Sequence, residues 1–166
     1  MGTVVLAVLV HMGEIRMAIA GTVLCVLFGL ARFDVRVAML GLLVYLTFMG
    51  DLRRLLVPMS GWSGSDPLLL VAPAITLVFF AGAVISRRLS LDTPVAKLVA
   101  LFMAFMTLQI FNPKQGGLMV GVAGAMLYLV PMLWFWIGRA FATRGLMRTW
   151  FFRVMPALAL FAAMMG

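Results

Sequence analysis

Long apolar runs separated by short polar clusters dominate the pattern of hydrophobic and polar positions along this chain. Five runs are prominent: Met17–Ala31, Val37–Gly50, Pro67–Ser86, Val95–Phe111 and Gly116–Gly138. They lack the polar–apolar alternation of membrane-barrel strands, so the pattern predicts helices. Because a backbone in lipid needs internal hydrogen-bond partners, helices are then the structures that can cross a membrane. We expect an all-α polytopic transmembrane helix bundle with about five to seven spans, at about 20 residues each.

Turn-forming and helix-capping residues mark the expected breaks between the runs. The breaks fall near residues 32–36, 51–66, 87–94 and 112–116. We interpret Asp51–Asp66 as a loop, because it contains a proline and a stretch rich in Gly and Ser. Asp66 can cap the free N–H groups of a helix that begins at Pro67. The Asp92-Thr93-Pro94 sequence opens the next run in the same way, and Asn112-Pro113 ends that run.

Small residues follow one face of the helix expected over residues 116–138. Gly117, Gly121 and Ala125 occur at positions i, i+4 and i+8, and Gly124 adds room beside them. Such a stripe lets a neighbouring membrane helix approach closely. A dinucleotide-binding role for these glycines is excluded, because no strand precedes them and the G-x-G-x-x-G spacing is absent.

The two ends of the chain carry further topological signals. Trp134 and Trp136 precede a basic cluster and predict an interfacial aromatic anchor. Arg139–Arg153 mixes arginines with aromatic residues, which is typical of a connection lying on the membrane surface. The apolar run Val154–Gly166 then stops without a polar flank, so we expect residues 1–166 to be one transmembrane domain from the N-terminal part of a longer protein. Met1–Gly13 has no basic start, so we do not expect a cleaved signal peptide.

Composition supports the membrane interpretation and removes several function classes. The 166 residues are 65% hydrophobic and 11% charged, with a mean hydropathy of +1.17, against about 45–50% and about 25% in soluble domains. A soluble enzyme, a disordered chain and a nucleic-acid-binding domain are therefore excluded. The only cysteine, Cys25, cannot form an intrachain disulfide, and with His11 as the single histidine there is no zinc-ligand cluster. We expect no metal and no cofactor.

The net charge of +8 reflects basic clusters between the apolar runs, where they contact lipid head groups and set topology. In the predicted topology, nine cations share one side of the membrane: Arg32, Arg36, Arg87, Arg88, Lys97, Arg139, Arg144, Arg148 and Arg153. Four lie on the other side: Arg16, Arg53, Arg54 and Lys114. The positive-inside rule places the first set in the cytoplasm.

Arg53 and Arg54 are the outer-face residues with the most promising chemistry. Adjacent guanidinium groups at head-group depth can hold a lipid-linked diphosphate through charge-assisted hydrogen bonds, and Lys114 is expected on the same face. The alternative is that the pair only anchors the helix at the interface, with Asp51 as the partner of one arginine. The five acids all lie at the edges of the runs, so the sequence offers no carboxylate pair for a proton relay inside the membrane.

Several short motifs together resemble the bacterial O-antigen polymerase/ligase-like membrane proteins of surface-polysaccharide assembly. The similar stretches are Leu91-Asp92-Thr93-Pro94, the Asn112-Pro113 corner, the glycine-containing run Gly116–Gly124 and the later Pro131-Met132. The resemblance covers the N-terminal half of such a protein. It implies a bacterial inner-membrane location and an undecaprenyl-diphosphate-linked glycan as donor, without a metal or nucleotide sugar. The family's catalytic residues lie in its C-terminal half, so no catalytic residue is carried over to this chain.

A small non-catalytic membrane scaffold or transporter subunit is the alternative function. The lack of a recognisable catalytic constellation and the small-residue stripe favour it.

Reporter fusions test the predicted topology. We expect a reporter that works only in the cytoplasm to be active when it is fused after Arg88 or Arg148 and inactive after Ser63, because of the uneven distribution of cations. The reversed pattern of activity would move Arg53, Arg54 and Lys114 to the cytoplasm.

Overall fold

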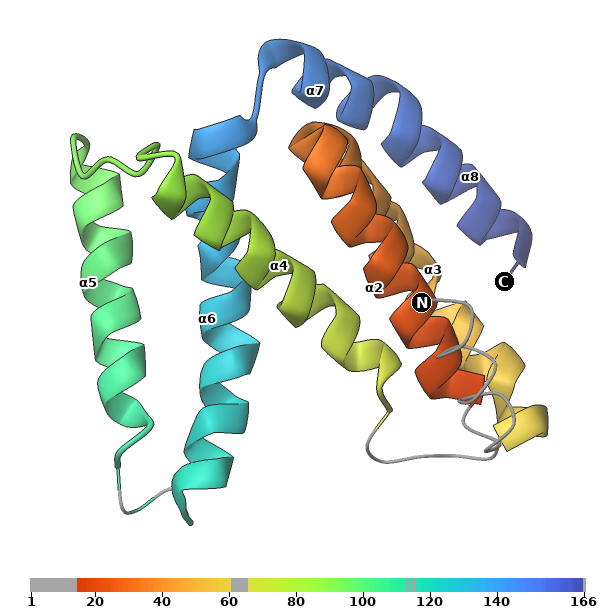
Figure 1. Ribbon diagram of the computed structural model, residues 1–166, viewed down its shortest axis with the longest axis horizontal. Coiled ribbons are helices and arrows are strands. Elements are labelled where there is room, and N and C mark those ends of the chain that lie inside the picture. Colours follow the sequence, from red (N-terminus) through yellow and green to blue (C-terminus); the bar gives the residue numbers. More distant parts are fainter. Residues whose placement is uncertain (1–14, 61–65, 113, 115, 166) are drawn as a thin grey trace. The chain divides into compact units, whose positions relative to one another are not determined.

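The computed structural model describes residues 15–60, 66–112, 114 and 116–165 (Figure 1). In chain order the elements are α2 (Ile15–Phe33), α3 (Val35–Ser60), α4 (Leu68–Ile85), α5 (Pro94–Gln109), α6 (Leu118–Phe141), α7 (Arg144–Thr149), the π-helical segment Trp150–Val154 and α8 (Met155–Met165). No strand occurs in these described ranges, which confirms the all-α prediction. The expectations for residues 1–13 and for residues 61–65 lie outside them.

The lengths and composition of the helices fit a multi-pass membrane protein. Within the part of the chain that the structure describes, five stretches are long and apolar enough to cross a membrane: Ile15–Phe33, Val35–Pro58, Leu68–Ile85, Leu118–Phe141 and Arg144–Met164. This agrees with the predicted transmembrane bundle. The remaining apolar helix, α5, has 16 residues, so it is about 24 Å long, which is less than the hydrocarbon thickness of about 30 Å.

The chain groups into two compact units. Unit 1 comprises residues 1–75 and 142–166, and unit 2 comprises residues 76–141. One transmembrane domain over residues 1–166 stays a prediction. The long helix α4 begins in unit 1 and ends in unit 2.

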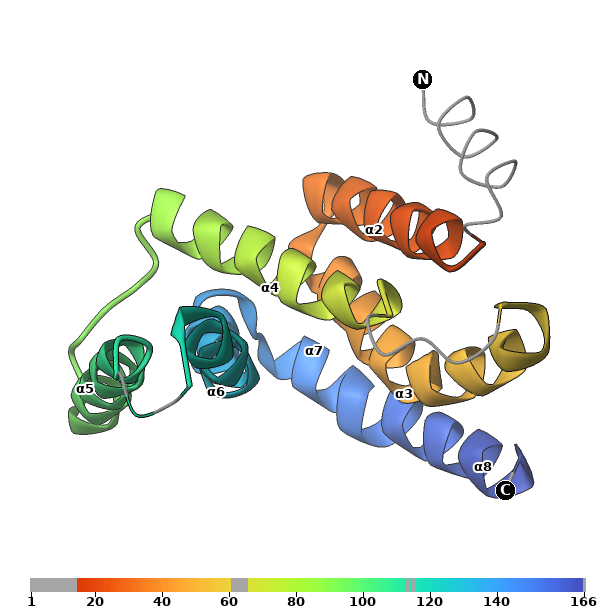
Figure 2. The same cartoon turned by 90° about the horizontal axis from the view of Figure 1, so that it is seen from below.

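In unit 1 the helices α2 and α3 form a hairpin and lie side by side (Figures 1 and 2). Their contact buries small and aliphatic residues, with Leu42 fully buried and Leu27 only 4% exposed. Gly41 allows the helices to approach closely, since a Cβ atom there would lie 3.1 Å from the Leu27 side chain. The helix α8 joins the same unit through an edge-on contact between Phe161 and Phe48, with ring centroids 4.8 Å apart.

In unit 2 the helices α5 and α6 run side by side and the second half of α4 contributes to the core (Figures 1 and 2). Phe79 and Ile137 are buried. Trp134 donates its indole N–H to the Thr76 hydroxyl at 3.2 Å, and Trp136, which is buried, donates to the sulfur of Met103 at 3.3 Å. Both tryptophans therefore have their N–H groups satisfied within unit 2, and their role as an interfacial anchor stays a prediction.

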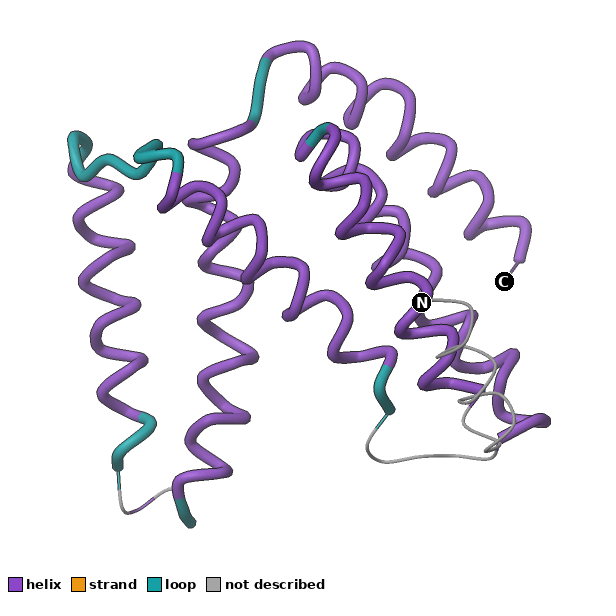
Figure 3. Tube along the Cα trace, in the orientation of Figure 1, coloured by secondary structure: helices purple, strands orange, loops and turns teal. Residues whose placement is uncertain are grey.

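A break between helices occurs at each of the four predicted positions, and the break near residues 51–66 is shorter than expected. Asp34 separates α2 from α3 and accepts a hydrogen bond from the Arg36 backbone N–H at 2.8 Å. Residues 86–93 and 110–117 connect the next helices, and both appear as non-helical tube in Figure 3. At the first of these connections Arg87 adopts φ 51°, and the Arg88 N–H bonds to the carbonyl of Ala83 at 3.0 Å, which caps the end of α4.

The prediction of a loop over Asp51–Asp66 is wrong for most of its length, because α3 continues to Ser60. The Leu and Arg residues after Asp51 are good helix formers. Helical geometry also places Leu56 in the core, where it is 5% exposed. Tertiary burial and propensity thus outweigh the polar residues and the proline near the end of the helix.

The small-residue stripe begins at Gly121 in the structure. Gly117 lies before α6 with φ 127°, as part of the turn with Gly116 at φ 84°, so the helix does not include it. A Cβ atom on Gly121 would lie 2.4 Å from the Ile110 carbonyl oxygen, which shows how closely the end of α5 approaches α6. Ala125 is buried on the same face, whereas Gly124 has no atom within 4 Å of an added Cβ.

The expected surface connection over Arg139–Arg153 is helical in the structure. The helix α6 ends at Phe141, and a new helical stretch begins at Arg144 and passes through the π-helical segment into α8. The π-helical segment ends just before Pro156, whose ring removes a donor and crowds the preceding turn. The Met155 N–H correspondingly bonds to the carbonyl of Trp150.

The close approach at Gly121 gives a stability test with an internal control. We expect Gly121→Ala to lower the free energy of unfolding by about 1–3 kcal/mol, because the new methyl group overlaps backbone that cannot easily move. The same change at Gly124, on the same helix but in open space, is expected to be neutral or to stabilise by up to about 1 kcal/mol. Denaturant unfolding in micelles, followed by circular dichroism, measures both, and equal effects would contradict the tight contact.

Candidate functional site

The carboxylate of Asp66 is the centre of a buried polar cluster in unit 1. Its side chain is completely buried. Oδ2 accepts hydrogen bonds from Arg16 Nη1 at 2.7 Å and from Arg53 Nε at 2.9 Å. Oδ1 accepts from the backbone N–H of Leu68 at 3.1 Å. The predicted capping role of Asp66 is confirmed, with the helix starting at Leu68 instead of Pro67.

Three helices meet at this cluster, and each of them supplies one of its groups. Arg16 comes from the first turn of α2, Arg53 from the last third of α3, and the capped N–H from the start of α4. The Tyr45 hydroxyl of α3 donates to the carbonyl of Leu68 at 2.7 Å and ties α3 to α4 a second time. A carboxylate at a helix N-terminus is also favoured by the helix dipole.

The described charges at this end of unit 1 are three cations and two acids. The cations are Arg16, Arg53 and Arg54, and the acids are Asp51 and Asp66. Within the described residues Asp51 forms no ion pair, so the partner of Arg53 is Asp66 and not the nearby Asp51. The alternative in which Asp51 pairs with Arg53 is therefore wrong, because Arg53 pairs with Asp66, 13 residues further along the chain.

The two candidate arginines have different environments. The Arg53 side chain is 28% exposed and uses its Nε for Asp66, while its two Nη groups form no hydrogen bond to a described residue. Arg54 is exposed and has no ion-pair partner in the ranges that the structure covers. The third candidate, Lys114, belongs to unit 2, where it is exposed and its backbone N–H bonds to Asn112 Oδ1 at 3.1 Å.

A second polar cluster, in unit 2, was not predicted from the sequence. The Arg139 guanidinium donates from Nη1 to the Thr93 hydroxyl at 2.8 Å and from Nη2 to the Ser90 hydroxyl at 3.2 Å, and it forms an ion pair with Asp92. Thr93 also caps α5 by accepting from the Ala96 N–H at 3.3 Å. The cluster thus fastens the loop before α5 to the end of α6.

Hydrogen bonds keep the acid of this second cluster ionised. The bond from Ser90 and the bond from Arg139 lower the pKa of Asp92 below its ordinary value. Arg88 reinforces the same end of unit 2, since it donates to the carbonyl of Ala140 at 3.2 Å and lies over the Phe141 ring. These partners are 46 to 52 residues apart in the sequence, so no local pattern indicated them.

The described residues contain no group of three His, Cys, Asp or Glu side chains that could hold a metal ion. The two clusters offer cations and hydroxyl groups, which suit the binding of anions.

Comparison with protein-family models gives no match, and comparisons with curated proteins and with solved structures give none either.

The buried Asp66 carboxylate can be tested by removal. We expect Asp66→Ala to lower the free energy of unfolding by about 3–5 kcal/mol, because it removes the buried carboxylate that pairs with both Arg16 and Arg53. Asp51→Ala is the control, because Asp51 forms no ion pair with a described residue. We expect it to change the free energy of unfolding by no more than about 0.5 kcal/mol. Unfolding in micelles followed by tryptophan fluorescence compares the two variants. A loss of less than about 1 kcal/mol for Asp66→Ala, which is the scale of an exposed ion pair, would contradict the cluster.

Proposed function

We propose that this chain is the N-terminal membrane portion of an O-antigen polymerase/ligase-like glycosyltransferase. In this proposal it acts on undecaprenyl-diphosphate-linked glycans at the periplasmic face of the bacterial inner membrane. The observation that carries the proposal is the arginine pair of α3, in which Arg53 is held by the buried Asp66 and Arg54 is exposed beside it.

The pairing with Asp66 prepares Arg53 for an anionic ligand. Because the ion pair uses Nε, the side chain is fixed in one orientation while its Nη groups remain for a second acceptor. A fixed donor loses less side-chain entropy when a ligand binds. A guanidinium also offers two parallel N–H groups to phosphate and keeps its charge at every physiological pH. Arg54 then supplies the uncompensated positive charge that favours a diphosphate over a neutral lipid.

The position of the pair along α3 suits a lipid-linked ligand. Arg53 and Arg54 follow the apolar residues 37–50 of the same helix, so they lie at head-group depth when that stretch is in the membrane. The polyprenyl chain would then extend along apolar helix surface. The chain's role is to bind and orient the donor, while the residues that transfer the glycan belong to other parts of the protein.

A second candidate is a non-catalytic membrane scaffold or transporter subunit. It is favoured by the span Arg144–Met164, of which no part is buried. Such a surface is available to the helices of another membrane protein.

Direct binding separates the role of Arg54 from stability. The probe is undecaprenyl diphosphate, titrated into the chain in phosphatidylcholine nanodiscs, with undecaprenol as the neutral comparison. We expect Arg54→Gln to weaken binding of the diphosphate about tenfold or more, the effect of losing a charged hydrogen bond worth about 1.5–3 kcal/mol. Because Arg54 is exposed and unpaired with described residues, the variant should fold normally.

The control is Arg32→Gln, which removes an exposed arginine from the other end of α2. It is expected to leave diphosphate binding unchanged. Equal affinity of wild type for the diphosphate and for undecaprenol, or an Arg54→Gln variant that binds as well as wild type, would overturn the proposal.

A further inference from the structure

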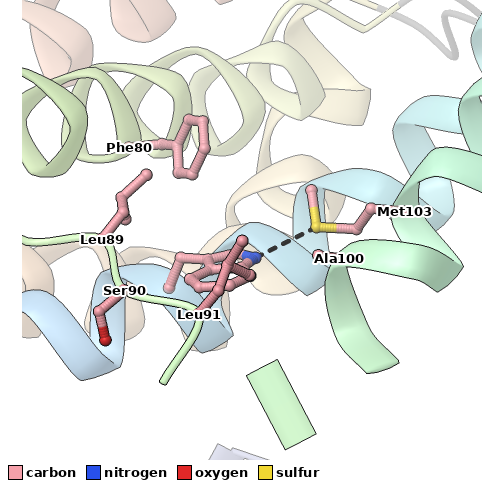
Figure 4. A pocket seen from close by; sticks show the side chains of 7 residues that line it. Phe80, Leu89, Ser90, Leu91, Ala100 and Met103 are labelled. Carbon is pink, nitrogen blue, oxygen red and sulfur yellow. Dashed lines mark hydrogen bonds between the residues drawn. The ribbon is translucent and has the colours of Figure 1, made fainter. Parts of the chain in front are cut away.

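Unit 2 contains a pocket of about 450 Å³ that the proposed function does not use. Its lining residues come from the end of α4, the following loop, α5 and α6: Phe80, Leu89, Ser90, Leu91, Ala100, Met103 and Trp136. Figure 4 shows the apolar side chains of Phe80, Leu89 and Leu91 around this space. Its volume lies within the range of about 300–1,000 Å³ that ligand pockets have.

The lining is apolar apart from Ser90, and its aromatic polar group is already satisfied. Trp136 donates its indole N–H to the sulfur of Met103 at 3.3 Å, drawn as the dashed line in Figure 4. The pocket therefore favours a hydrocarbon occupant over a polar one, since a buried polar group needs a hydrogen-bond partner.

Two cations lie one helical turn along the chain from residues that line the pocket. Arg139 follows Trp136 by three residues on α6 and Lys97 precedes Ala100 by three residues on α5, so each cation shares a helix face with a pocket residue. Arg139 is occupied by Asp92, Ser90 and Thr93. In this end of unit 2 the four cations Arg87, Arg88, Lys97 and Arg139 face one acid, Asp92, which leaves a net charge of +3.

Lys97 is the cation of this group best placed for a ligand. It is exposed. It lies in the first turn of α5, and no ion pair engages it among the residues that the structure describes. An ammonium group there can reach an anion whose apolar part lies one turn further along the helix.

We propose that this pocket binds an anionic phospholipid, with one acyl chain against Phe80, Met103 and Trp136 and the phosphate facing Lys97. The apolar pocket matches the acyl chain of such a lipid, and the cations at this end of unit 2, which we call the rim, match its phosphate. Burial of hydrocarbon supplies affinity for any acyl chain, and the net charge of the rim selects the anionic head group. The site is in unit 2 and does not depend on the arginine pair of unit 1.

Retention of lipid by the purified chain tests this site. The chain is extracted into micelles that contain equal amounts of phosphatidylglycerol and phosphatidylcholine with the same acyl chains, and bound lipid is counted by native mass spectrometry. We expect wild type to retain phosphatidylglycerol in preference to phosphatidylcholine. Lys97→Gln should reduce this preference about fivefold, the factor expected for one basic residue near a membrane surface.

Two further variants make the result specific. Ala100→Phe fills the pocket and is expected to lower retention of both lipids, while Arg148→Gln removes an exposed cation of α7, in unit 1, and should retain lipid as wild type does. Thermal unfolding shows whether each variant is folded, and Ala100→Leu replaces Ala100→Phe if the larger residue unfolds unit 2. Equal retention of the two lipids by wild type, an unchanged preference in Lys97→Gln, or an equal loss in Arg148→Gln would overturn the proposal.

Discussion

The carboxylate of Asp66 carries a structural role that no other described acid of unit 1 shares, because it links α2, α3 and α4 within one buried cluster. Taking a charged group out of water costs several kcal/mol, so the cluster persists only when every charge has partners. Asp66 meets this condition with two guanidinium groups and one backbone N–H. The start of α4 and the hairpin of α2 and α3 consequently depend on each other, and a change in any of the three charged residues affects all of these helices.

The distribution of polar contacts follows from the membrane character of the helices. The Asp66 cluster is buried and joins the starts of α2 and α4 to the last third of α3, while the more exposed pair of Arg139 and Asp92 joins the end of α6 to the loop before α5. The candidate spans of these helices are apolar. In unit 2 the close approach of Gly121 to Ile110 brings the end of α5 to the start of α6, and Trp134 and Trp136 donate to acceptors within the unit. Close packing and polar contacts therefore both hold unit 2 together.

Local sequence signals predicted the helices and most of their breaks. Long-range contacts determine the features that the sequence did not predict, which are the extension of α3 and the second polar cluster. Asp92-Thr93-Pro94 and Asp66 were recognised as helix starts because capping needs only neighbouring residues. The prediction of a loop over residues 51–60 was wrong because the burial of Leu56 and the ion pair between Arg53 and Asp66 depend on distant parts of the chain. The second cluster, in which Asp92 pairs with a residue 47 positions away, left no local pattern at all.

In each unit an acid pairs with one cation, while another cation nearby stays exposed. In unit 1 Asp66 fixes Arg53 and leaves Arg54 exposed, and in unit 2 Asp92 fixes Arg139 and leaves Lys97 exposed. A paired arginine contributes mainly to the fold, since its charge is compensated and its position is set. The exposed cation near it keeps a full charge at low structural cost, and it is therefore the residue that can be replaced without unfolding the helix. Anion binding in unit 1 would use both kinds of residue, since the Nη groups of the paired Arg53 remain for a second acceptor, whereas in unit 2 it would rest on the exposed Lys97.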